Sequence, residues 1–73
     1  MNRMMVAVNM KVQCADGSTH DSVTLAVEDA QRIYLAADGS TLDNVESIEE
    51  CVSLLPPMAL AAVLSRCKEN SNG

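Results

Sequence analysis

Three cysteines and one histidine are the residues whose types could support metal or thiol chemistry: Cys14, Cys51, Cys67 and His20. A structural zinc site needs four ligands that converge tetrahedrally, and these usually come in close pairs such as Cys-x2-Cys. No two of these four residues have that spacing. A cysteine on an apolar face behaves as a small hydrophobic residue, so we predict no metal site and no cofactor.

Thiol catalysis would also need a base that generates the thiolate. His20 is the only histidine, and it comes close to Cys14 if residues 5–27 form a hairpin. The sequence offers no third group that would orient this pair. We therefore predict no catalytic residues and no enzymatic activity, and keep a small metal- or thiol-dependent enzyme as the last alternative.

The charge is unevenly distributed: ten acidic and five basic residues give a net charge of −5. Between Arg32 and Arg66 there is no Lys or Arg. Nucleic-acid binding depends on clustered bases that neutralise phosphates, so we predict no direct binding of nucleic acid. A partner with a basic surface fits better, although a solvated acidic face is the commoner explanation. The acidic residues of this stretch are Asp38, Asp43, Glu46, Glu49 and Glu50.

A short motif, Ala-Asp-Gly-Ser-Thr-x-Asp-x-Val, starts at Ala15 and again at Ala37, 22 residues later. A phosphate-binding loop needs several consecutive backbone donors that lead into a helix. Each copy has one glycine and acidic neighbours, so both copies are predicted to be turns.

The elements that position these residues begin with a hairpin over residues 5–27. Apolar residues alternate with polar ones on both sides of Asp16-Gly17, as in half-buried strands joined by a tight turn. A two-residue turn there brings the apolar residues to the same side of the hairpin. It pairs Met10 with Val23, Val8 with Leu25, and Val6 with Val27.

Residues 28–37 fit two structures. Their composition includes good helix formers, whereas Ile33, Tyr34 and Leu35 are typical of a strand. The recurrence of the Asp-Gly turn after Ala36 favours a third strand over 32–36.

Two helices are expected next, over about 44–55 and 57–68. Asp43 and Glu46 resemble a capping box, and apolar residues follow at helical spacing. Pro56-Pro57 separates the helices, with Pro57 suited to a first helical position. The predicted fold class is α+β: a two- or three-stranded antiparallel meander with both helices packed on one face. The apolar residues of the first helix are Val45, Ile48, Val52 and Leu55.

A chain of 73 residues is enough for one domain, 1–73, with frayed ends expected at 1–4 and 70–73. The longest apolar run, Leu54–Leu64, is half a membrane span and contains two prolines. An odd number of cysteines suits reduced thiols, so we expect a cytoplasmic protein that does not bind membranes.

The leading functional hypothesis is a small non-enzymatic regulator or inhibitor, such as a phage- or plasmid-encoded inhibitor of a host enzyme or defence complex. It would bind a protein partner through an acidic helix face (Asp43, Glu46 and Glu50) and an apolar helix (Leu60 and Leu64). The alternative is an obligate homo-oligomer with a structural or accessory role, in which an apolar helix or a strand edge meets its own copy.

Overall fold

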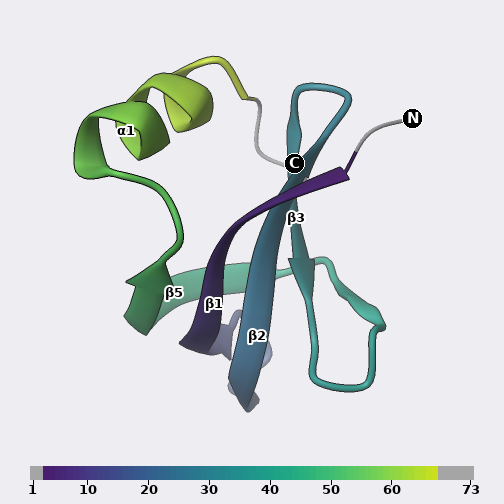
Figure 1. Ribbon diagram of the computed structural model, residues 1–73. Coiled ribbons are helices and arrows are strands. Elements are labelled where there is room, and N and C mark those ends of the chain that lie inside the picture. Colours follow the sequence, from purple (N-terminus) through teal and green to yellow (C-terminus); the bar gives the residue numbers. More distant parts are fainter. Residues whose placement is uncertain (1–2, 68–73) are drawn as a thin grey trace.

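The computed structural model describes residues 3–67, which form five strands and one short helix (Figure 1). The strands make one antiparallel sheet in the order β4-β3-β2-β1-β5. The first four strands follow one another as a meander, and the last returns to the other side of β1. Their bounds are β1 Arg3–Cys14, β2 Thr19–Glu28, β3 Gln31–Leu35, β4 Thr41–Leu42 and β5 Val45–Ser53.

The helix predicted over 44–55 is wrong, because this segment is strand β5. Ile48 and Val52 fit a helical spacing, but both are β-branched, and in the sheet they pair with Val12 and Val8 of β1. Pairing with β5 also gives β1 hydrogen-bond partners on its second side. The predicted α+β arrangement with two helices is therefore replaced by a five-stranded sheet with one short helix.

The predicted hairpin exists, but its turn is one residue longer than expected. The Cys14 amide donates to the Ser18 carbonyl at 2.8 Å, which leaves three residues in the loop. Gly17 has a φ of 91°, a left-handed conformation that glycine adopts without steric cost.

The predicted register holds only at Met10, which pairs with Val23. Leu25 pairs with Ala7 instead of Val8, and Val27 pairs with Met4 instead of Val6. Positive φ angles at Asn9 (53°) and Ser22 (59°) lie where the register shifts. Such irregularities insert an extra residue into one strand, and no simple alternation predicts them.

The third strand expected over 32–36 is present as β3, and a two-residue turn joins it to β2. Asp29 and Ala30 form this turn with φ angles of 55° and 62°. Two consecutive positive φ angles are typical of a type I′ turn, in which Asp-Gly or Asn-Gly is preferred. Ala30 therefore occupies a position that favours glycine.

Replacing Ala30 with glycine should raise the free energy of unfolding by about 1 kcal/mol, because an L-residue in the left-handed region costs about 1–2 kcal/mol. Urea unfolding would measure the change. The matched control is Ala37→Gly, in the second Asp-Gly turn, since Ala37 is not among the residues with positive φ. Equal destabilisation by both substitutions would contradict the strain assigned to Ala30.

The core lies on the two central strands, since every fully buried hydrophobic residue within 3–67 belongs to β1 or β2. Half-buried side chains from the other elements close over it. The twisted sheet carries β5 behind β1 and β2, while the helix lies beside one end of the sheet (Figure 1). The buried residues are Val6, Ala7, Met10, Val12, Cys14, Val23, Leu25 and Ala26.

The helix, α1 (Pro57–Ser65), begins at the proline predicted for its first position and ends before the expected residue 68. Its Leu60, Val63 and Leu64 pack against the core. The Arg32 guanidinium donates to the Leu64 carbonyl at 3.2 Å, which ties the end of α1 to β3. No helix among residues 3–67 is long and apolar enough to cross a membrane.

The ends of the chain were expected to fray at 1–4 and 70–73. Arg3 and Met4 belong to β1, where they pair with Glu28 and Val27. Residues 1–2 and 70–73, and the predicted end of the helix at 68, lie outside the described residues.

Candidate functional site

The outer edge of β5 combines exposure, charge and open backbone. β5 is the last strand of the sheet on the β1 side. Val45 is half-buried, and every other residue of the strand is exposed. The carboxylates of Glu46, Glu49 and Glu50 lie on the strand, and Asp43 precedes it. We call these four residues and the outer side of β5 the acidic edge.

Backbone hydrogen bonds to β1 and to the residue that follows it hold both ends of this strand. The Ala15 amide donates to the Asn44 carbonyl at 2.8 Å, immediately before β5. The Leu54 amide donates to the Val6 carbonyl at 2.9 Å, immediately after it. Since β1 anchors β5 along its length, the outer edge of β5 is held in an extended conformation.

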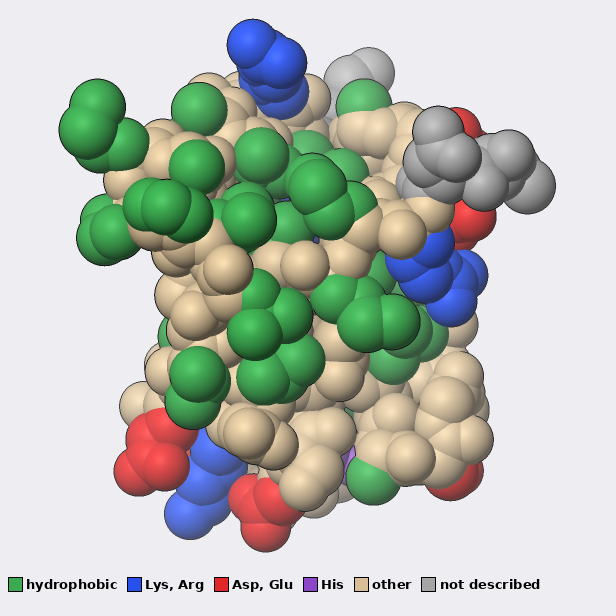
Figure 2. Space-filling view, in the orientation of Figure 1, with side chains coloured by type: hydrophobic (Ala, Val, Ile, Leu, Met, Phe, Trp, Pro, Cys, Tyr) green, Lys and Arg blue, Asp and Glu red, His purple; other side chains and the backbone are tan. Residues whose placement is uncertain are grey.

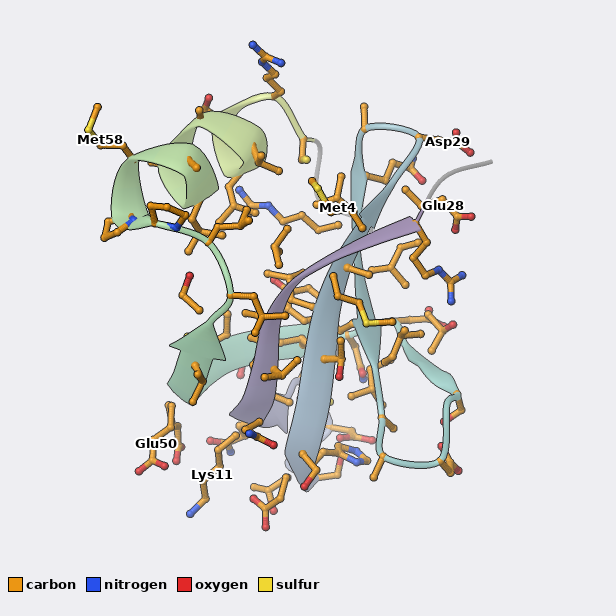
Figure 3. All side chains as sticks on the ribbon, viewed as in Figure 1. Met4, Lys11, Glu28, Asp29, Glu50 and Met58 are labelled. Atoms are coloured by element: carbon orange, nitrogen blue, oxygen red, sulfur yellow. The ribbon has the colours of Figure 1, made fainter. Side chains whose placement is uncertain are left out.

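The carboxylates of the acidic edge are solvent-exposed. The ion pair found within residues 3–67 joins Arg3 Nη2 and Glu28 Oε1 at 3.1 Å, at the other end of β1. Glu50 is the register partner of Lys11, and Figure 3 shows their side chains near one another at the same end of the molecule. No hydrogen bond or ion pair in the described part of the chain engages the four carboxylates, whereas the hydroxyl of Ser53 on β5 donates to the Leu55 carbonyl at 2.8 Å.

Apolar side chains accompany the carboxylates. Ile48, Val52 and Leu54 are 46%, 52% and 51% exposed, which is high for large hydrophobic residues in so small a domain. In the space-filling view, hydrophobic side chains gather over α1 and the middle of the sheet, and charged groups lie toward the rim (Figure 2). The acidic edge therefore offers both charge and apolar contact area.

The five residues predicted to bind a partner separate into two groups. Glu46 and Glu50 lie on strand β5 and Asp43 precedes it, so the three do not share a helix face and are spread along an extended segment. Leu60 and Leu64 are half-buried and pack on the core. The exposed large hydrophobic residue of α1 is Met58, 86% exposed, whose side chain points away from the sheet (Figure 3). Binding of a partner by Leu60 and Leu64 stays a prediction. Because both side chains are half-buried, only part of their surface is accessible to a partner.

The sulfur and imidazole groups do not converge. Cys14 is buried, Cys51 is exposed on β5, and Cys67 is half-buried with its thiol 3.1 Å from the Val63 carbonyl. His20 pairs with Val12 in the β1–β2 register. Within residues 3–67 no three His, Cys, Asp or Glu side chains are arranged to hold a metal ion.

The two Asp-Gly turns have the same hydrogen bonds. The amide and hydroxyl of Ser18 donate to Asp16 Oδ1 at 2.9 and 2.7 Å, and Ser40 makes the same bonds to Asp38 at the same distances. The serine hydroxyl, and then its amide, lower the pKa of each aspartate below its usual 3.8. These carboxylates close turns, which confirms the structure predicted for the repeated motif.

Sequence reasoning missed the exposed apolar residues of β5 and left Glu49 out of the candidate site. No regular alternation could have found Ile48 and Val52 of β5, or Leu54 directly after it, because the ladder with β1 shifts between Ile48 and Glu50 and again between Glu50 and Val52. Comparison with known protein families, with characterised proteins and with solved structures finds no match to this chain.

Proposed function

We propose that the protein is a non-enzymatic regulator or inhibitor that binds a partner protein through the acidic edge of β5. The observation that supports this most strongly is an exposed edge strand whose four neighbouring carboxylates make no ion pair within residues 3–67. Complementary charge steers association and selects partners, so the partner surface that fits is basic. A phage- or plasmid-encoded inhibitor that covers a basic groove of a host enzyme or defence complex would use such a surface.

A second candidate is the homo-oligomer, favoured by the exposed Ile48, Val52 and Leu54. Antiparallel pairing of two β5 edges would bury part of this apolar area. It would also bring Glu46, Glu49 and Glu50 of one copy near those of the other, and like charges in neighbouring strands destabilise the pairing. Charged edge strands commonly prevent such self-association. A basic partner therefore ranks above a second copy.

A cytoplasmic location belongs to the same proposal. Cys14, Cys51 and Cys67 are free thiols. Free thiols persist in reducing compartments, whereas disulfides form in secreted proteins.

Charge reversal on β5 tests the proposal, with a nine-residue peptide, Lys-Thr-Val-Thr-Lys-Thr-Val-Thr-Lys, as the basic probe. The double variant Glu46→Lys/Glu50→Lys should bind this peptide about tenfold more weakly than the unchanged protein, or weaker still, because two attractions become repulsions. Titration calorimetry at low and high salt would measure the dissociation constants, and salt should weaken binding to the unchanged protein.

The matched control is Asp21→Lys/Glu28→Lys on β2, which changes the net charge by the same amount. Loss of the exposed Arg3–Glu28 ion pair should cost at most about 1 kcal/mol of stability. This control should retain most of the peptide binding. Equal weakening by both double variants would show an effect of net charge alone and would contradict a site on β5.

A further inference from the structure

The open edge of β5 presents backbone groups as well as side chains. No strand within residues 3–67 pairs with its outer side. Backbone N–H and C=O groups require hydrogen-bond partners, and an unpaired edge is a template on which another extended chain can form a ladder. Several kinds of protein recognise peptides by adding them as a strand to such an edge. The geometry therefore favours a ligand segment in an extended conformation.

The ladder between β5 and β1 is regular at Val52 and Ser53, which pair with Val8 and Ala7. The next register shift lies between Val52 and Glu50, where two residues of β1 face one of β5, so the extra residue belongs to β1. The Leu54 amide points to β1, since it donates to Val6. Backbone groups of successive residues in a strand point to opposite sides. Those of Ser53 and Cys51 are therefore directed outward, where an added strand would meet them.

The side chains next to the outward backbone groups of Cys51 and Ser53 determine which residue types the added strand should have. Glu50 and Val52 lie on one face of β5, and Leu54 continues that face directly after the strand. Lys11 lies across from Glu50 and Val8 across from Val52 on the β1 side. A strand added on the outer side would repeat this pairing, with a basic residue beside Glu50 and apolar residues beside Val52 and Leu54.

We infer that β5 binds an extended basic segment of its partner by antiparallel strand addition. A Lys or Arg of that segment lies beside Glu50, and an apolar residue two positions away lies beside Val52. This inference rests on the proposed function and adds the binding mode and the recognised pattern. The antiparallel direction continues the arrangement of the sheet and is the slightly more stable pairing per residue.

N-methylation of the peptide backbone separates strand addition from simple charge attraction. The nine-residue peptide used above reads the same in both directions, and its Lys and Val residues alternate with Thr. In the inferred complex the Thr amides point to Cys51 and Ser53, whereas the Lys and Val amides point away from β5. Methylation of all Thr amides should weaken binding about tenfold or more, since ladder hydrogen bonds are lost. Methylation of the inner Lys and the two Val amides should change it by less than about threefold.

The unmodified peptide and the two methylated peptides carry the same side-chain charge. Differences in their binding therefore report on the backbone amides. If both methylated peptides bind as well as the unmodified one, strand addition is wrong. The proposed function then survives if Glu46→Lys/Glu50→Lys still weakens binding. If methylation of the Lys and Val amides alone abolishes binding, the antiparallel alignment is wrong. If the unmodified peptide does not bind at all, the proposed function fails, and strand addition fails with it.

Discussion

Replacing Met10 with alanine should lower the free energy of unfolding by about 3 kcal/mol. Met10 is 1% exposed and is the largest of the fully buried side chains within residues 3–67. It lies opposite Val23 at the centre of the β1–β2 pair. Truncation removes buried methylene groups and leaves a cavity that rigid strands on both sides of β1 can fill only in part. A domain of this length has a total stability of about 4–11 kcal/mol, so the loss would be a large fraction.

Met58→Ala provides a control with the same chemistry. Met58 is 86% exposed on α1, so its truncation should change stability by less than about 0.5 kcal/mol. Urea unfolding of both variants, followed by circular dichroism, gives the two free energies. Equal losses for the two methionines would contradict a core centred on β1 and β2.

The double variant Leu60→Ala/Leu64→Ala should lower the free energy of unfolding by about 3 kcal/mol, or about 1.5 kcal/mol for each half-buried side chain. Both leucines pack against the buried residues of β1 and β2 and cover one side of the core. The Arg32–Leu64 hydrogen bond involves the backbone carbonyl of Leu64. It can persist after truncation, so the expected loss reflects apolar contacts. Thermal unfolding and light scattering on the same samples would measure stability and mass.

Leu54→Ala is the control, because Leu54 is 51% exposed on the β5 side of the sheet. It should cost less than about 1 kcal/mol. The homo-oligomer would be supported if Leu60→Ala/Leu64→Ala lowered the mass in solution without lowering the stability of the monomer. That outcome would place the two leucines at an interface between copies and contradict their packing on the core.

The sequence predicted the strands that lie next to a recognisable turn motif. The Asp16-Gly17 turn and the alternation around Met10 predicted the first hairpin, and the second Asp-Gly turn favoured β3. The register could not be predicted, because it depends on left-handed residues at Asn9 and Ser22 that fit no turn signal. The two shifts offset each other, and Val27 faces Met4 instead of Val6 because the turn is one residue longer and a further shift lies between Met5 and Ala7.

β5 could not be predicted because its environment is set by a strand far away in sequence. The segment carries a capping-box pattern and apolar residues at helical spacing, but pairing with β1 outweighs these local preferences. An edge strand with both faces partly exposed has little pressure for regular alternation. The acidic character of Asp43, Glu46 and Glu50 was visible in the sequence, whereas their place on an open sheet edge required the fold. The unpaired backbone of that edge is the reason why this charged segment is a candidate for strand addition.

The most direct test of the central claim is a map of the bound peptide on the protein by NMR. The nine-residue basic peptide would be titrated into the uniformly ¹⁵N-labelled full chain, and amide chemical shifts and hydrogen exchange would be followed. The account predicts the largest shifts over residues 49–54, with slower exchange of the Cys51 and Ser53 amides as they enter a new ladder. Shifts centred on α1 or on the Asp16 and Asp38 turns, or unchanged exchange at Cys51 and Ser53, would contradict binding at the edge of β5.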